Sequence, residues 1–365
     1  MSEPVLELRS ISKNFGANEA LKDVNLTVPH GSLIVILGPA GAGKTTTLRI
    51  IAGLEAPTSG QVFIEGHDFT NHQPNMRDIA MIFDNLALYP NKTGYENIAS
   101  PLRIAKTPKA EIERQVHEMA KMLKIDHILD RTPATFSGGE RQRVALGRAM
   151  VRQPRFYLLD EPLSSLDFML RIDLRTELKR LQRESGRTFL FATPDYTEAL
   201  ALADTVCVLL DGEVRQVAKA QELYDEPVDR DVAKFVGNPP INIMPGRLTR
   251  ENGDASIAIG DVRLKLPKEM EHGLPASLSD VEIGVRPEHV RMVGGDSTGA
   301  HLSGAVNDLE PLGMHTTVGV NLGGVNLFFT VPGVQEFKDG DNIEMHLDME
   351  SILFFDPQTG RRVSS

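Results

Sequence analysis

Short apolar runs alternate with longer polar segments over the first 235 residues of the chain. The runs SLIVIL (32–37), FYLLD (156–160) and TFLFAT (188–193) are typical of strands buried on both faces, and each is followed by a segment with helical character. Strands of this kind, alternating with helices, indicate a parallel sheet covered by helices. The pattern therefore predicts an α/β domain.

Two local patterns add detail to this domain. Between SLIVIL and FYLLD, four apolar residues recur at helical spacing: Ile112, Val116, Met119 and Leu123. This spacing predicts a helical insertion across about 95–150. We interpret this stripe as core rather than as a cofactor site. The dipeptide DG at 211–212, between TVCVLL and EVRQVA, predicts a β-hairpin.

The pattern changes after FVGNPP (235–240), whose double proline marks a boundary. From there on, apolar and polar residues alternate with period two in segments broken by glycine turns, which indicates a small all-β barrel or sandwich. We expect a boundary near 236–242, with domains at 1–236 and 237–365. The alternating segments are ASIAIGDVRLKL (255–266), TVGVNLGGVNLFFTV (317–331) and NIEMHLDMESILFF (342–355).

Composition narrows the range of functions. The 365 residues, 41% hydrophobic and 24% charged, are those of a globular protein large enough for two domains. A net charge of −11 argues against non-specific nucleic-acid binding, because phosphates would be repelled. The single cysteine, Cys207, is interpreted as packing and favours a reducing compartment. We expect neither a signal peptide nor direct membrane insertion, since no basic segment precedes an apolar one and no long apolar run occurs.

The motif GPAGAGKT fits the phosphate-binding pattern G-x-x-x-x-G-K-[ST] and lies between a predicted strand and a predicted helix. Glycines let backbone N–H groups curl around phosphates, and the helix N-terminus adds its dipole. Lys44 can reach the terminal phosphates of a nucleotide, and the Thr45 hydroxyl can ligate Mg²⁺. We expect ATP to be bound by Gly38, Pro39, Ala40, Gly41, Ala42, Gly43, Lys44, Thr45 and Thr46.

The run FYLLDEP supplies a complementary pair of carboxylates, Asp160 and Glu161, where a buried strand ends. Adjacent side chains at a strand end point in different directions. Asp160 can therefore hold Mg²⁺ together with Thr45, while Glu161 polarises the attacking water. Acidic residues after a strand are also common as solvated loop starts, but the phosphate motif upstream favours the catalytic interpretation.

The segment SGGERQRVALGRAM begins with a second candidate phosphate site. Ser137 and Glu140 form an S-x-x-E capping box, which needs no function beyond starting a helix. Gly138 and Gly139 also give close backbone access at a helix end, as a phosphate site requires. The two interpretations are compatible.

Together, FSGGERQRVALGRAMVRQP and FYLLDEPLSSLD resemble the signature, Walker B and D-loop motifs of ATP-binding-cassette (ABC) ATPases, at that family's spacing behind the phosphate-binding loop. The resemblance extends over almost the whole chain and points to the sugar-importer branch typified by the maltose importer ATPase subunit. It rests further on ALYP (87–90), ENIA (96–99), FVGNPPIN (235–242), GVRPEHV (284–290) and EPLG (310–313).

This resemblance implies a P-loop NTPase fold followed by a regulatory barrel of the OB or TOBE type. It implies that Phe15 stacks on adenine, although a core phenylalanine is the alternative, and that Asp167 belongs to the D-loop. It further implies a head-to-tail pair of cassettes, in which each ATP lies between the P-loop of one subunit and the signature of the other. The implied partners are a second ATPase subunit, two transmembrane permeases and an external solute-binding protein, at the cytoplasmic face of a bacterial inner membrane.

Two positions depart from the family pattern. Asp84 stands in MIFDNLALYP where the family has a glutamine that contacts Mg²⁺ and the attacking water. A carboxylate there repels the triphosphate unless Mg²⁺ lies between them. Pro194 stands in FATPDY where the family has a histidine that donates to the γ-phosphate. Losing one such donor lowers a rate by about 10²–10³.

We therefore expect this chain to bind ATP and Mg²⁺ but to hydrolyse poorly at its own P-loop. The favoured hypothesis is the impaired half of a heterodimeric ATPase pair, which lends its signature to a complete site on a sister subunit. The alternatives are a slow homodimer and a nucleotide-bound regulatory subunit with almost no hydrolysis. A cassette protein acting on DNA or ribosomes is disfavoured, because the chain shows neither two cassettes nor a long coiled coil. The solute, expected to be a sugar, polyol or glycerol derivative, is selected by the other subunits.

Overall fold

The computed structural model describes residues 3–164, 166–251, 254–272, 274–275, 278–293 and 300–363. Ser165, in the middle of the LSSLD motif, lies outside them. The chain divides into two compact units, residues 1–220 and 221–365. The division falls before FVGNPP, so that two short helices precede the β-rich region within the second unit.

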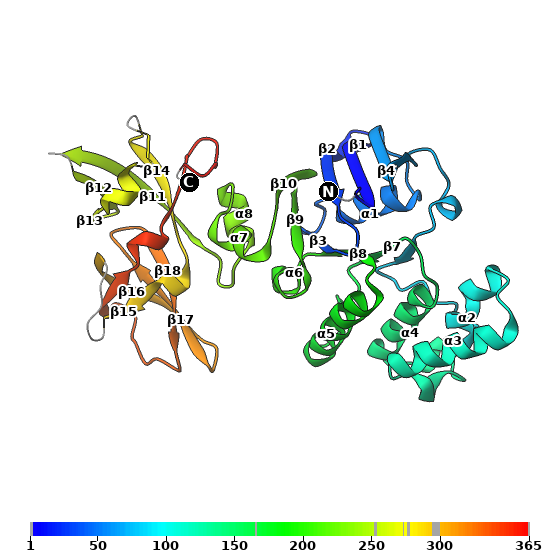
Figure 1. The fold of residues 1–365 in the computed structure, drawn as a ribbon. Helices are drawn as coiled ribbons and strands as arrows, with labels where there is room; N and C mark the ends of the chain where they lie inside the picture. Colours follow the sequence, from blue (N-terminus) through cyan, green and yellow to red (C-terminus); the bar gives the residue numbers. More distant parts are fainter. Residues whose placement is uncertain are drawn as a thin grey trace. The chain divides into compact units, whose positions relative to one another are not determined.

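The first unit contains the α/β elements (Figure 1). Its strands and helices are β1 (Leu6–Phe15), β2 (Asn18–Val28), β3 (Leu33–Leu37), α1 (Lys44–Ala52), β4 (Ser59–Ile64), β5 (His67–Asp68), β6 (Ala80–Ile82), α2 (Gly94–Ile104), α3 (Lys109–Met122), α4 (Gly138–Met150), β7 (Phe156–Asp160), α5 (Phe168–Ser185), β8 (Thr188–Thr193), α6 (Tyr196–Leu202), β9 (Thr205–Leu210) and β10 (Glu213–Ala218).

A six-stranded sheet runs through this unit in the order β10-β9-β3-β8-β7-β6. The pairs from β9 to β6 are parallel, and β3, β7 and β8 are buried along their whole length, so the predicted helix-covered parallel sheet is confirmed. Strand β10 pairs with β9 in antiparallel fashion through the predicted DG hairpin, where Asp211 and Gly212 both have positive φ. Parallel order places the carboxyl ends of β3, β6, β7 and β8 at one edge of the sheet.

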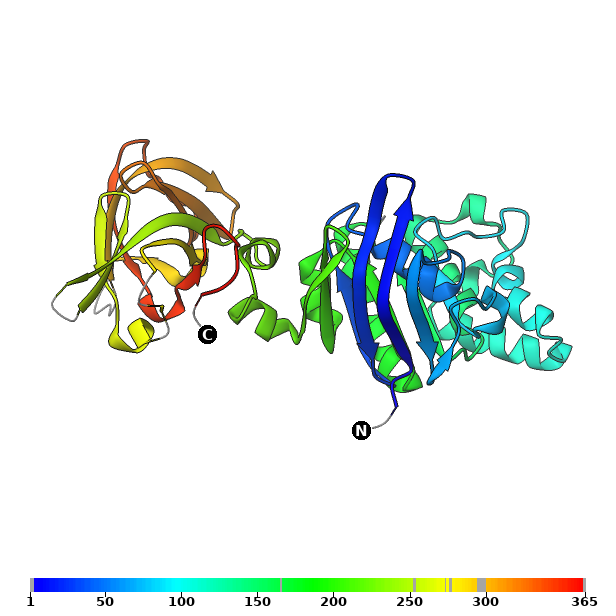
Figure 2. The same cartoon turned by 90° about the horizontal axis from the view of Figure 1, so that it is seen from above.

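A second sheet, which the sequence patterns did not predict, is antiparallel with the order β2-β1-β4-β5. Figure 2 shows β1 and β2 side by side as two long dark-blue strands. One hydrophobic core joins this sheet to the parallel sheet and to α1, whose Leu48, Ile50 and Ile51 are fully buried. Because α1 is buried between them, its N-terminus is held at the carboxyl edge of the parallel sheet.

Helices α2, α3 and α4 form the predicted helical insertion, grouped together in Figure 1. Of the predicted stripe, Ile112, Val116 and Leu123 are buried and Met119 is half-buried, as expected of core positions. Helix α2 begins with a capping box between Thr93 and Glu96. The insertion is therefore a packed subdomain rather than an extended loop.

The second unit is β-rich, and in Figure 2 its strands curve around a common centre. Two five-stranded sheets, in the orders β13-β12-β11-β14-β20 and β15-β19-β16-β17-β18, share one hydrophobic core. The elements are α7 (Ala220–Asp225), α8 (Arg230–Phe235), β11 (Asn242–Glu251), β12 (Asp254–Ile259), β13 (Val262–Lys265), α9 (Lys268–His272), β14 (Asp280–Val285), β15 (Val290–Met292), β16 (Ala300–Pro311), β17 (His315–Asn321), β18 (Asn326–Pro332), β19 (Asn342–Leu347) and β20 (Leu353–Phe355).

A buried arginine closes the far end of α1. Arg77 is 1% exposed, and its guanidinium donates to the carbonyl oxygens of Ile50 and Ile51 at 2.9 Å and to those of His72 and Thr70 at 3.0 and 3.1 Å. Burial lowers the pKa of Arg77, yet an arginine remains charged at neutral pH. This side chain therefore ties the last turn of α1 to the loop before β6.

Replacing Arg77 with methionine is expected to destabilise the first unit by about 3 kcal/mol, because several buried carbonyl groups lose a charged donor. Urea denaturation followed by far-UV circular dichroism measures this loss. The matched control is Arg180→Met, which removes an arginine from the exposed face of α5. Equal losses in the two variants would contradict the role assigned to Arg77.

Candidate functional site

A cavity of about 570 Å³ opens at the N-terminus of α1. Its wall also contains residues that the sequence analysis did not assign to the site, among them Asn18 and Lys22 from β2 and Asp211 from the DG hairpin. Phe15, at the end of β1, is 48% exposed here, with the Lys13 ammonium 4.8 Å from its ring centroid. The sequence-predicted residues in the wall are Phe15, Ala40, Gly41, Gly43, Lys44, Thr45, Thr46 and Glu161.

The first turn of α1 is not capped by a side chain, because its N-cap residue is Gly43 in the left-handed conformation (φ 103°). A Cβ atom at this position would lie 2.5 Å from Leu21 Cδ2 and 2.8 Å from the Ala20 carbonyl oxygen, so only glycine fits. Helices α2 and α4, in contrast, begin with capping boxes. The N–H groups that start α1 are therefore suited to bind an anion.

The Lys44 side chain is 4% exposed and lies against the loop that precedes it. Its ammonium group donates to the carbonyl oxygens of Gly38 at 2.9 Å and Pro39 at 3.0 Å. It also lies 3.2 Å from Glu161 Oε1. The Lys44 ammonium is thus held beside the N-terminus of α1, and both the ammonium and the helix end favour binding of phosphate oxygens.

Thr45 and Asp160 meet at the end of β7, where the Thr45 hydroxyl donates to Asp160 Oδ1 at 3.0 Å. Burial raises the pKa of Asp160, the hydrogen bond from Thr45 lowers it, and the charges of Asp84 and Glu161 raise it. A hydroxyl and a carboxylate side by side suit Mg²⁺, which binds through one or two protein oxygens together with phosphates. Across the described residues, no group of three or more acidic, histidine or cysteine side chains forms a metal cage.

Glu161 has a strained backbone, with φ at 45°. Its amide donates to the Ala192 carbonyl on β8 at 3.0 Å, which fixes the position of the residue. The side chain is half-buried and turns toward Lys44. Strain of this kind concentrates at functional sites, where it holds a side chain in a defined direction.

Asp84 and Pro194 follow β6 and β8, the two neighbours of β7, so they lie at the same sheet edge as Asp160. Both are exposed, and neither belongs to the cavity wall as far as the structure describes it. Asp84 accepts a hydrogen bond from the Asn85 amide at 2.9 Å. The negative charge of Asp84 raises the pKa of Asp160, after the larger effects of burial and of the Thr45 hydrogen bond.

The SGG segment starts α4 and lies outside this cavity wall. The predicted capping box is confirmed, since Ser137 Oγ accepts from the Glu140 amide at 3.2 Å and Glu140 accepts from the Ser137 amide at 2.7 Å. The hydrogen bond from the Ser137 amide to the Glu140 carboxylate lowers the pKa of Glu140. Ser137 and Gly138 are exposed, whereas Gly139 is buried. The chain thus presents a second glycine-rich helix N-terminus, separate from the first.

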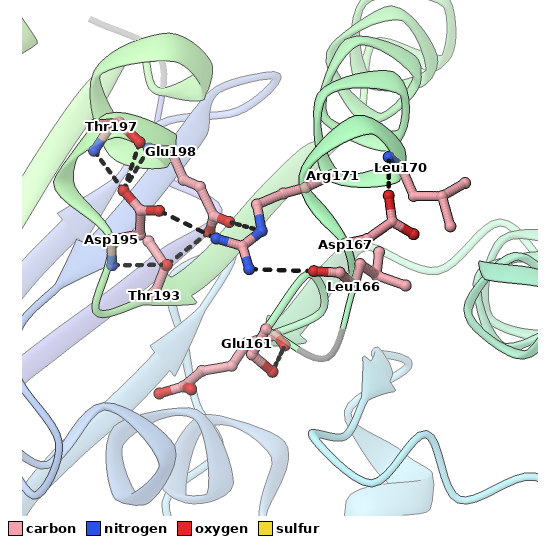
Figure 3. Close-up of polar contacts among 10 residues, drawn as sticks. Glu161, Leu166, Asp167, Leu170, Arg171, Thr193, Asp195, Thr197 and Glu198 are labelled. Atoms are coloured by element: carbon pink, nitrogen blue, oxygen red, sulfur yellow. Dashed lines mark hydrogen bonds and ion pairs between the residues drawn. The ribbon is translucent and has the colours of Figure 1, made fainter. Parts of the chain in front are cut away.

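Figure 3 shows a polar network that the sequence did not indicate, around Arg171 in the first turn of α5. Asp167 begins this helix, because its side chain accepts from the Leu170 amide at 3.1 Å. Arg171 reaches Asp195 and Glu198 near the start of α6. Arginine and glutamate on a helix are typical of a solvated surface, so the sequence carried no local signal for these contacts.

Comparison with known families and proteins gives matches to three family models. The ABC transporter model matches residues 21–164, the MalK OB fold domain model 237–290 and the TOBE domain model 283–355. In the residues that the structure describes, no helix is both long and apolar enough to span a membrane.

Similar proteins include the sn-glycerol-3-phosphate import ATP-binding protein UgpC 1 of Rhizobium johnstonii, 40% identical over 99% of this chain and 96% of that protein. The trehalose/maltose import ATP-binding protein MalK of Thermococcus litoralis is 39% identical over 98% of this chain and 99% of its own length. Among solved structures, the ATP-binding cassette MJ0796 in a dimeric post-hydrolysis state with ADP and Pi matches with a TM-score of 0.54 and 32% identity. That match covers 59% of this chain and 98% of the other.

Proposed function

Because this chain belongs to the family of ABC transporter ATPases, which couple ATP hydrolysis to transport, we propose that it is the ATP-binding subunit of an importer for a sugar, polyol or glycerol-type solute. The relatives are named for the import of glycerol 3-phosphate and of trehalose or maltose. Since they match over nearly their whole length, the barrel-bearing second unit belongs to the likeness as much as the ATPase unit does.

Phe15 would stack on the adenine of ATP, the N-terminus of α1 and Lys44 would bind its phosphates, and Thr45 and Asp160 would hold Mg²⁺. Supporting this placement, the cavity at α1 carries an uncapped helix end and a held ammonium group. Glu161, fixed in a strained conformation and half-buried, orients the attacking water. When bound, Mg²⁺ neutralises charge on the transferred phosphoryl group.

The Ser137–Glu140 segment serves the ATP of a second ATPase subunit, and Asp167 contacts that subunit as part of the D-loop. One observation supports assigning the Ser137–Glu140 segment to the ATP of another subunit: the exposed SGG helix start lies outside the wall of the cavity at α1. The further partners are two transmembrane permeases and an external solute-binding protein, with this chain peripheral to the membrane on its cytoplasmic side.

The second ATPase subunit is a non-identical sister, and this chain is the catalytically impaired half of the pair. Pro194 carries the proposal, since it stands at the carboxyl end of β8 without a side-chain donor or a backbone N–H. Asp84 adds a negative charge near Asp160, where a neutral amide would be expected. ATP at this chain's P-loop thus mainly holds the pair closed, while hydrolysis proceeds at the sister's site.

Purification of the transporter through a tag on this chain tests the proposal. Mass spectrometry is expected to find two kinds of cassette subunit in equal amounts, together with the permeases. A complex with a single kind of cassette subunit and ordinary ATP turnover would refute the asymmetric pair, while leaving the importer assignment intact.

A further inference from the structure

Arg171 connects two segments that are distant in sequence. Its Nη2 donates to the Leu166 carbonyl at 3.3 Å, next to Asp167. Its Nη1 lies 3.5 Å from Asp195 Oδ2, and its Nε lies 3.7 Å from Glu198 Oε1. Figure 3 shows the guanidinium between these two groups of residues, reaching from α5 toward the start of α6. The planar fork of arginine suits such a bridge, since it has several donors in a fixed geometry.

The turn that Arg171 reaches is the one that carries Pro194, and protein contacts hold it on both sides of the proline. Thr193 Oγ1 accepts from the Asp195 amide at 3.0 Å and donates to Glu198 at 2.7 Å. Asp195 is the N-cap residue of α6, and its Oδ1 accepts a hydrogen bond from the Thr197 amide at 2.8 Å. The Thr193 carbonyl accepts from the Gly38 amide at 3.3 Å, which joins the turn to the phosphate-binding loop.

The first turn of α5 also contacts the SGG segment. Gly139 is buried, and a Cβ atom added to it would lie 2.9 Å from Leu170 Cδ1. The backbone at Gly139 therefore packs closely against the Leu170 side chain. The Leu170 amide in turn donates to Asp167. One helical turn therefore contacts the SGG helix start, the Leu166–Asp167 segment and the turn at Pro194.

We propose that Arg171 is a positioning residue, which fixes the Leu166–Asp167 segment and the SGG helix start against the turn at Pro194. The inference rests on the proposed function, in which these segments serve the ATP of the sister subunit. Pro194 can make no side-chain hydrogen bond to a γ-phosphate, so protein contacts alone set the position of its turn. Through Arg171, the fixed turn at Pro194 also fixes the first turn of α5. This chain therefore presents a preorganised surface to its sister, whether or not the ATP at its own P-loop is hydrolysed.

The test uses the complete transporter, purified with its permeases and both ATPase subunits, and measures steady-state hydrolysis of Mg-ATP. Arg171→Met is expected to lower kcat about tenfold and to leave KM for ATP within about twofold, because positioning rather than nucleotide binding is lost. Arg171→Lys keeps a charge without the fork, and we expect an intermediate kcat. The matched control is Arg183→Met, which removes an exposed arginine from the last turn of the same helix and should leave kcat unchanged.

A double-mutant cycle separates positioning from a general loss of stability. Asp195→Asn keeps a side chain that can cap α6 but removes the charge that faces Arg171. If the two residues act as one unit, the double variant loses no more kcat than Arg171→Met alone. An unchanged kcat in Arg171→Met, or a rise in KM together with a lower melting temperature, would overturn the inference. The proposed asymmetric pair is tested separately, by counting the kinds of cassette subunit with mass spectrometry. Even in a complex of identical subunits, the effect of Arg171→Met on kcat could still be measured.

Discussion

Replacing Gly139 with aspartate in this chain is expected to lower ATP hydrolysis by the assembled importer about 10²-fold or more, whereas Glu161→Gln in the same chain should cost less than about twofold. In the proposed pair, the SGG helix start of this chain completes the sister's competent site. Aspartate there adds a negative charge to the helix start that the proposal assigns to the sister's γ-phosphate, at a helix end that favours anions. Its Cβ would also press on Leu170.

Glu161 belongs to the site that the proposal treats as already impaired. Its carboxylate is fixed beside Lys44, but Pro194 supplies no donor at the neighbouring strand end, so little turnover remains to be lost. Both variants are measured as purified complexes with Mg-ATP, after permease content and circular dichroism have shown that assembly and folding are retained. A loss of 10²-fold or more from Glu161→Gln would show that this site carries much of the hydrolysis and would contradict the asymmetric pair.

Local sequence signals were sufficient wherever a short segment determines its own structure. The runs 156–160 and 188–193 became β7 and β8 with the predicted bounds, because a strand buried on both faces must be apolar throughout. The DG hairpin and the capping box of Ser137 and Glu140 also depend only on neighbouring residues. The phosphate-binding loop is of the same kind, since its glycines precede the helix that they serve.

Contacts between distant segments left no such signal. Arg77 is an ordinary polar residue in the sequence, and only the fold places it under the end of α1. Arg171 likewise meets Asp195 and Glu198 because α5 packs beside α6, which no periodicity reports. In the antiparallel sheet, β1 pairs with β4 across the α1 segment, so that pairing left no local signal either. Strands β1 and β2 are neighbours in sequence, and their hairpin was not predicted. Residues that line the cavity from this sheet, such as Asn18, were missed with it.

Restoring the two family residues, Asp84→Gln together with Pro194→His, is expected to raise hydrolysis at this chain's own site about 10²-fold. The local structure favours the histidine substitution. Pro194 is exposed, and the turn is held by Thr193 and Asp195 on either side of it, so loss of the ring should not release the turn. An imidazole at this position adds a donor at the carboxyl edge of the sheet, and glutamine at position 84 removes a charge that acts on Asp160.

Single-site turnover is the required readout, measured in a complex whose sister subunit has its own catalytic carboxylate replaced. Affinity for Mg-ATP should change little, because Lys44, Thr45 and the N-terminus of α1 are untouched. Pro194→Ala and Asp84→Asn serve as matched controls: the first removes the ring without adding a donor, and the second removes the charge at unchanged length. If alanine raises turnover as much as histidine does, then the proline restrains the turn rather than leaving a donor missing. If none of the variants changes turnover, the impairment of this site does not reside in these two residues.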